Sequence, residues 1–139
     1  MEPLDLAGIA RRLYLEEGYS CSESVLHALK KSAWDIPEAL LRSVSGLRTG
    51  IGGSGCVCGA LMAVVLTVGY VYGADKAKAN QLSAELHNKF RGQFKSACCR
   101  VLTRKYDFKS QARKEFCAGL VESMISELGK MPSEGGASS

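Results

Sequence analysis

The sequence lacks an apolar run long enough to cross a membrane, and it lacks the composition of a secreted scaffold. Its most apolar stretch, residues 57–71, is shorter than the roughly 20 residues that a bilayer core requires. Cysteine accounts for six of the 139 residues, about 4% and short of the roughly 8–10% typical of disulfide-built secreted domains. Residues 1–15 contain no signal-peptide pattern, because Arg11 and Arg12 interrupt them. We therefore expect a cytoplasmic protein with no membrane span.

Motifs of the common hydrolases and cofactor enzymes are also missing. There is no P-loop, no H-E-x-x-H, no pair of carboxylates and no Ser/His/Asp series. There is no C-x-x-C either, so neither a thioredoxin-type site nor a zinc ribbon is indicated. The cysteines still need an account, because cytoplasmic thiols stay reduced unless they are catalytic, redox-sensing or bound to metal.

Period-two alternation of apolar residues is absent, whereas helical spacing is common along the chain, and this predicts an all-α fold. We expect one compact domain over residues 1–129, with about six helices around a buried central helix at Val57–Val71. The apolar surface of that helix would also tolerate a contact with a second copy in a homodimer. Residues 130–139 are rich in Gly and Ser and are expected to form a disordered tail.

Capping residues predict where the helices begin. The first helix is expected over Pro3–Glu17, and Ser20 with Glu23 forms a capping box for the second. Further helix starts are predicted at Pro37, Asp75, Ser96 and Ser110.

Most of the cysteines fall at the start of a predicted helix. There, unpaired backbone N–H groups and the helix dipole stabilise a thiolate, and the cysteines concerned are Cys21, Cys56, Cys58, Cys98 and Cys99. Cys117 lies well inside the last helix. Helical periodicity turns one cysteine on each of four helices toward the core, namely Cys21, Cys58, Cys99 and Cys117. A single buried cysteine often acts as a small hydrophobe, but inert packing has no need of thiols in close pairs at helix starts.

A glycine-rich loop precedes the central helix. Gly50, Gly52 and Gly55 match G-x-G-x-x-G, but the strand that a dinucleotide site requires before this motif is missing. We expect the loop instead to let backbone approach closely around the neighbouring cysteines. The N–H groups of Gly52, Gly53 and Gly55 would then be available to a sulfur or an anion.

Basic residues are concentrated in residues 89–114. This segment holds nine Lys and Arg residues and one acidic residue, Asp107, so nine minus one gives a net charge of +8. Three interpretations are open: a solvated helical face, a surface for anions or nucleic acid, or a positive field that lowers the pKa of nearby thiols.

The order of cysteines and glycines resembles a known family. Cys58-Gly59-Ala60-Leu61-Met62-Ala63 follows the glycine loop, with Cys21 upstream and with Cys99-Arg100-Val101-Leu102-Thr103 and Cys117-Ala118-Gly119-Leu120-Val121 downstream. From about Ser20 to Met124 the chain resembles the redox-active protein family named for its C-GCAxxG-C-C pattern. Ala63 stands where the motif usually ends in glycine, and Cys56 and Cys98 are additional cysteines.

The resemblance implies a small helical bacterial protein with a redox role, related to the non-haem part of split-Soret cytochromes, where cysteines are thought to hold an iron–sulfur centre. No C-x-x-C-H is present for haem attachment. Carried over position by position, the family cysteines are the four that periodicity turns inward: Cys21, Cys58, Cys99 and Cys117.

The leading hypothesis is a cytoplasmic oxidoreductase or electron-transfer protein in which these four cysteines converge. They would be ligands of an iron–sulfur cluster, or a dithiol/disulfide set without a cofactor, with Cys56 and Cys98 as resolving thiols. Its partner would be an unidentified redox protein. The alternative is a binding module with structural cysteines or zinc and a basic surface for anions; nucleic acid is not the favoured partner.

Overall fold

The structure is a computed structural model that describes residues 5–32 and 34–131. This part of the chain folds into seven helices and contains no strand, which confirms the predicted all-α class. The helices are α1 (Leu6–Glu16), α2 (Cys21–Lys31), α3 (Glu38–Ser43), α4 (Gly59–Tyr72), α5 (Lys76–Phe94), α6 (Cys99–Thr103) and α7 (Gln111–Gly129).

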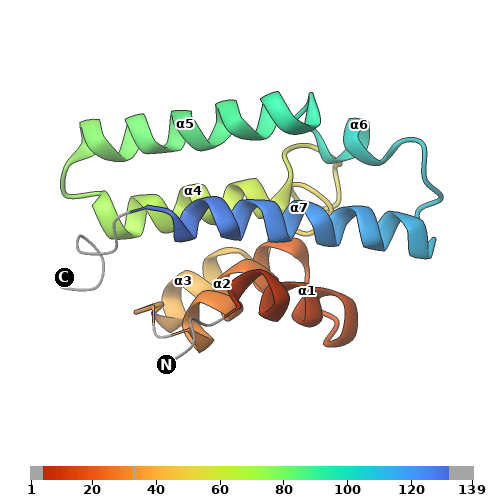
Figure 1. Ribbon diagram of the computed structural model, residues 1–139, viewed down its shortest axis with the longest axis horizontal. Coiled ribbons are helices and arrows are strands. Elements are labelled where there is room, and N and C mark those ends of the chain that lie inside the picture. The colour runs from red at the N-terminus through yellow and green to blue at the C-terminus, as the bar shows by residue number, and fades with distance from the viewer. Residues whose placement is uncertain (1–4, 33, 132–139) are drawn as a thin grey trace.

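The helices form three layers around α4 and α7, which lie side by side in the middle (Figure 1). Helix α5 covers one side of this pair, mainly through α4, and α1, α2 and α3 cover the other (Figure 1). The loop before α4 and the short helix α6 lie at the same end of the molecule (Figure 1). This arrangement brings the beginnings of α2, α4 and α6 toward that end.

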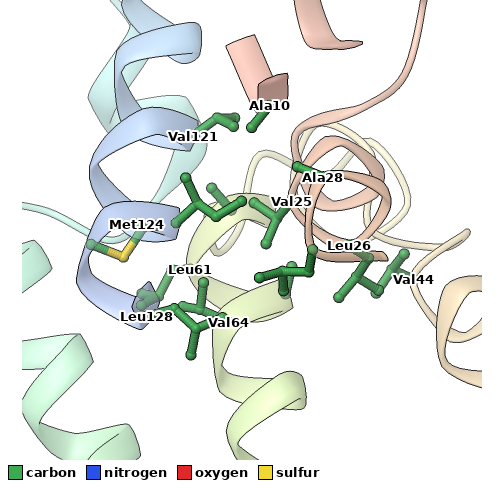
Figure 2. Close-up of a cluster of buried hydrophobic side chains, with 14 of the residues drawn as sticks. Ala10, Val25, Leu26, Ala28, Val44, Leu61, Val64, Val121, Met124 and Leu128 are labelled. Atoms are coloured by element: carbon green, nitrogen blue, oxygen red, sulfur yellow. The ribbon is translucent and has the colours of Figure 1, made fainter. Parts of the chain in front are cut away.

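The core lies between α2, α4 and α7 (Figure 2). Val25 of α2, Val64 of α4 and Met124 of α7 are completely buried. Burying a side chain of this kind contributes about 1.5–3 kcal/mol relative to leaving it in water. Ala63, at the position where the family motif has glycine, is also completely buried, which fits a role in helix packing.

Several predicted helix starts are confirmed. The capping box of α2 is complete, because the Ser20 hydroxyl accepts from the backbone N–H of Glu23 and the Glu23 carboxylate accepts from that of Ser20. The side chains of Asp75 and Ser110 cap α5 and α7 in the same way, by accepting N–H groups three residues on.

The starts of α4 and α6 differ from the prediction. Val57 has a φ of 57°, in the left-handed region, so α4 begins at Gly59 with Cys58 as its N-cap rather than at residue 57. Cys98, not Ser96, is the N-cap of α6. The Ser96 hydroxyl, three residues before the helix begins, instead accepts the N–H of Cys98 at 3.1 Å.

The C-terminal end of α7 is fixed by its last residues. Lys130 forms an ion pair with Glu127, and Met131 packs against the core. The remainder of the predicted tail, residues 132–139, lies outside the described residues, as does Pro3 at the predicted start of the first helix. Within residues 5–32 and 34–131, no helix combines the length and the apolar character needed to span a bilayer.

Candidate functional site

Four cysteines from four helices come together at one end of the molecule. Cys21 and Cys99 are the first residues of α2 and α6, and Cys58 is the N-cap of α4. Cys117 lies in the second turn of α7 and is buried. Cys21 interacts electrostatically with each of the other three thiols, so the four form one cluster. All six cysteines of the chain are free thiols.

The beginnings of α2 and α4 are held together through Ser22 and Gly59. The buried Ser22 hydroxyl donates to the carbonyl oxygen of Leu47 at 3.0 Å, which ties α2 to the loop before α4. A Cβ added at Gly59 would lie 3.0 Å from the same Leu47 oxygen and 3.6 Å from Cβ of Cys21. Because a side chain at this position would press on the Leu47 oxygen, Gly59 allows the beginning of α4 to lie close to Cys21.

Two backbone hydrogen bonds join the beginnings of α4 and α6. The N–H of Cys58 donates to the carbonyl of Ala97, and the N–H of Arg100 donates to the carbonyl of Gly55, both at 2.8 Å. Gly55 has a φ of 80°, and a Cβ there would lie 2.8 Å from Cβ of Arg100. The close approach that the glycine loop predicts is therefore present, and it brings Cys99 near Cys58.

The predicted anion-binding role of the glycine N–H groups is not supported by the hydrogen bonds. The N–H groups of Gly52, Gly53 and Gly55 donate to loop carbonyls at 2.8–3.0 Å. The expectation that these three N–H groups are free is therefore wrong, because they form hydrogen bonds within the turns of the loop. The loop positions the cysteines without offering these donors to a ligand.

Cys21 and Cys117 lie close enough for a hydrogen bond between their side chains to shift the pKa of both thiols. The hydrogen bond and burial raise the pKa of Cys21 well above its ordinary value. The same hydrogen bond, together with Arg113 and the Tyr14 hydroxyl, lowers the pKa of Cys117 to about 7. Two chemically identical side chains thus differ, with Cys117 as the thiolate and Cys21 as the donor, because the cation and the hydroxyl lie on the side of Cys117.

Arg113 is the cation that acts on the pKa values of Cys117 and Cys99. It is only 9% exposed. Its guanidinium donates to the carbonyl oxygen of Phe108 at 3.4 Å, and also to the sulfur of Cys99. The guanidinium also lies 4.6 Å from the centre of the Phe108 ring, a cation–π contact. Of the three interpretations of the basic segment, the positive field on the thiols has direct support at this position.

The other two thiols of the cluster favour the protonated form. Burial raises the pKa of Cys58 to about 12, although the backbone N–H groups of Leu61 and Ala60 at the beginning of α4 oppose the shift. Burial and the nearby Cys117 raise the pKa of Cys99, and Arg113 opposes the shift. The beginning of α4 therefore stabilises the thiolate of Cys58 as predicted, but burial has the larger effect there.

Cys56 and Cys98 lie beside the cluster rather than in it. Both are half-buried, as are Cys21 and Cys99, but neither is among the main causes of the pKa shifts of the four clustered thiols. Cys56 lies in the loop, before the N-cap of α4, and not in a helical turn as predicted. Each N–H donates at 3.1 Å to the hydroxyl of a serine two residues earlier, Ser54 for Cys56 and Ser96 for Cys98.

A cavity opens beside the thiol cluster. It has a volume of about 310 Å³ and its walls include Cys21, Cys99, Cys117, Tyr14 and Arg113. Small-molecule sites in proteins range from about 300 to 1,000 Å³. Cys21 and Cys117 therefore both lie in the wall of a cavity of this size, although Cys117 is only 3% exposed.

A metal or an iron–sulfur cluster would require three or four thiolates directed at a common centre. Among residues 5–32 and 34–131, no three Cys, His, Asp or Glu side chains are arranged so that they could hold a metal ion. The four thiols in this arrangement therefore do not form a ready-made metal site.

Sequence patterns do not reveal the surroundings of Cys117. Tyr14 was missed, although it lies four residues after the buried Ala10 and so shares its face of α1. Arg113 is one of nine basic residues in its segment, and nothing local distinguishes it from the others. Both become recognisable only when α1 and α7 pack against each other.

Comparison with known proteins identifies the family of this chain. The sequence model of the family described as "Putative redox-active protein (C_GCAxxG_C_C)" matches residues 19–131. No curated protein and no solved structure matches the chain. The matched region covers four of the five long helices and all six cysteines. On this match, which spans most of its length, the chain belongs to the C_GCAxxG_C_C family of redox-active proteins.

Proposed function

We propose that the protein is a thiol–disulfide oxidoreductase in which Cys117 is the attacking thiolate and Cys21 is its resolving thiol. The observation that carries this proposal is that Cys21, Cys117 and the buried Arg113 line the same cavity. A thiolate, not a thiol, is the nucleophile in disulfide exchange, and a pKa near ambient pH gives the best attacking group. The pKa of Cys117, about 7, meets this requirement.

In the first step, the Cys117 thiolate attacks one sulfur of a substrate disulfide R–S–S–R. A mixed disulfide Cys117–S–S–R forms, and R–S⁻ leaves. In the second step, the sulfur of Cys21 attacks Cys117, the second R–S⁻ leaves, and the proton of Cys21 passes to it. Two electrons move from the pair of Cys117 thiolate and Cys21 thiol to the substrate, which becomes one thiolate and one thiol, and the protein becomes the disulfide. A reduced partner protein restores the dithiol by the reverse exchange.

The other residues of the site have separate roles in this proposal. Arg113 and Tyr14 stabilise the thiolate of Cys117, and the raised pKa of Cys58 keeps it protonated and unreactive beside the pair. Arg113 acts on Cys99 as well as on Cys117, so Cys99 is a third thiol available for exchange. Cys56 and Cys98 are alternative resolving thiols. The proposal places the protein in a reducing compartment such as the cytoplasm, where thiols stay reduced unless they are catalytic, redox-sensing or bound to metal.

The proposal is tested by equilibrating the purified protein in buffers of defined thiol–disulfide potential and mapping its disulfides by mass spectrometry. We expect one two-electron couple with a Cys21–Cys117 disulfide. The Cys21→Ser variant should lose this disulfide and accumulate the mixed disulfide on Cys117. Cys56→Ser and Cys98→Ser are matched controls and should retain it.

Two results would overturn the proposal. One is that no disulfide involving Cys117 forms at any potential. The other is that anaerobically purified protein holds stoichiometric iron, sulfide or zinc and that a chelator abolishes its redox couple. If Cys117 instead forms a disulfide with Cys56 or Cys98, that cysteine is the resolving thiol, and the assignment of this role to Cys21 is wrong.

A further inference from the structure

The cavity beside the thiol pair is positively charged. Four cationic side chains line it, and none of its twelve lining residues is acidic. The cations are Arg48, Lys109, Arg113 and Lys114. Among the described residues, the ion pairs of the protein involve other lysines and arginines, so no carboxylate neutralises these four.

The buried guanidinium of Arg113 is the most informative of the four. Its hydrogen bonds go to the sulfur of Cys99 and to the carbonyl of Phe108, and both are weak substitutes for a carboxylate. A charge that is nine-tenths buried is costly unless an opposite charge lies close to it. The thiolate of Cys117 supplies one negative charge, but that charge is lost when Cys117 forms a disulfide. An anionic group in the cavity would replace it at that step.

A second cavity extends the positive region. It has a volume of about 290 Å³ and shares Thr49, Cys99, Phe108 and Arg113 with the first. Its own cations are Arg100 and Arg104, and it too has no acidic residue in its walls. Phe108, which is 63% exposed, stands where the two cavities adjoin. A negative charge on either side of Arg113 is therefore favoured.

We propose that the substrate of this site is a small anionic disulfide, with a carboxylate or a similar group a few bonds from its sulfurs. This inference rests on the proposed function, because the disulfide must exchange with Cys117. The volume of the first cavity is at the lower end for small-molecule sites, which favours a molecule with few atoms over a folded protein. The anionic groups lie against Arg48, Lys109 and Lys114 while the disulfide meets Cys117, and the substrate leaves as two anionic thiols.

The test compares three symmetric disulfides of similar length and different charge: 3,3′-dithiodipropionate, bis(2-hydroxyethyl) disulfide and cystamine. The rate at which each oxidises the reduced protein is divided by its rate with a small neutral thiol, to remove differences in intrinsic reactivity. We expect the dianion to react about 10-fold or more faster than the dication at low salt, and the difference to shrink as ionic strength rises.

Variants then locate the effect. Replacing Lys109 and Lys114 by glutamine should lower the ratio of the dianion rate to the neutral rate several-fold. The matched control replaces Lys95 and Lys105, which lie outside this cavity and line another one. The control removes the same net charge and should leave the ratio unchanged.

The outcomes separate the two proposals. If none of the three disulfides oxidises the Cys21–Cys117 pair, the proposed function fails. If all three oxidise it at equal corrected rates, or the dication is fastest, the redox function stands and the anionic substrate is wrong. If both double variants lower the ratio equally, the preference comes from net charge and not from this cavity, which also overturns the inference.

Discussion

Cys21 and Cys117 illustrate how identical side chains acquire different chemistry. The two sulfurs share one hydrogen bond, but Cys117 also has the guanidinium of Arg113 and the hydroxyl of Tyr14 nearby. Burial and the neighbouring thiols raise the pKa of Tyr14, so its hydroxyl stays protonated and donates to Cys117. The negative charge therefore settles on Cys117.

Removing the charge of Arg113 should shift the titration of Cys117. In the Arg113→Gln variant the pKa of Cys117 should rise from about 7 toward its ordinary value of 9.0, because a cation beside a thiolate lowers its pKa. The pH at which alkylation of Cys117 by iodoacetamide reaches half its maximum rate should rise accordingly. Mass spectrometry of the peptide that carries Cys117 gives this rate at each pH.

Arg104→Gln is the matched control for this measurement. Arg104 is exposed and has no part in the pKa of Cys117, so its removal should leave the alkylation midpoint in place. Equal midpoints for the wild type and Arg113→Gln would show that Arg113 does not stabilise the thiolate.

At the scale of elements, two short segments decide how the helix beginnings meet. The loop before α4 turns through left-handed backbone at four glycines and also at Thr49 and Val57. A β-branched residue such as Val57 adopts this conformation only where its surroundings impose it. Here the hydrogen bond of the next residue, Cys58, to Ala97 holds the backbone in place. The strain at Val57 is the local cost of placing Cys58 against α6.

Gly59 and Gly69 in α4 form a natural pair for testing the packing of this helix. Gly59→Ala should lower the free energy of unfolding by about 1–3 kcal/mol, because the new methyl group would lie 3.0 Å from the Leu47 oxygen. In Gly69→Ala the new methyl group meets no atom within 4 Å. This variant should raise the free energy of unfolding by about 0.5–1 kcal/mol, since alanine favours helix over glycine. Urea unfolding of the reduced proteins measures both.

Gly59→Ala should also affect the thiol cluster. Gly59→Ala widens the gap between α2 and α4, so disulfide exchange at Cys21 should change with it, whereas Gly69→Ala should leave exchange unaltered. A gain of stability in Gly59→Ala would contradict the close packing of these two helix beginnings.

At the scale of the whole molecule, burying the thiol cluster makes stability depend on alkaline pH. Burial raises the pKa of Cys58 from 9.0 to about 12. Because the folded pKa exceeds the unfolded one, the folded state holds the proton more tightly. This contribution to stability is complete below pH 9 and is lost as the pH rises from 9 to 12. Cys21 and Cys99 have raised pKa values and act in the same direction.

Cys58→Ser should therefore reduce the alkaline loss of stability. Serine does not ionise in this range, so the fall in the free energy of unfolding between pH 9 and 12 should be shallower, by up to about 1.4 kcal/mol per pH unit. Urea unfolding at a series of pH values, in the presence of a reductant, measures the slope.

Val64→Ala serves as the control, because it removes buried apolar atoms near the centre of the core without removing a titrating group. It should lower stability at every pH and leave the slope unchanged. A Cys58→Ser slope equal to that of the wild type would contradict the raised pKa of Cys58.

Local patterns in the sequence were sufficient for most of the helix beginnings. Capping residues such as Ser20 and Asp75 act within one turn, and the 3.6-residue period decides which face carries Cys117, so both can be read without knowing the fold. Local patterns failed at Val57 and at the N–H groups of the glycine loop, where contacts with α6 and turns within the loop decide the backbone.

The sequence by itself therefore determined the all-α class and most helix limits, because these depend on neighbours within a few residues. Only the tertiary structure decided which thiol ionises and what surrounds it. Tyr14, Cys21 and Arg113 come from three separate parts of the chain and meet Cys117 only when α1, α2 and α7 pack together. A thiol pKa depends on charge and burial in space, and these are properties of the packed molecule.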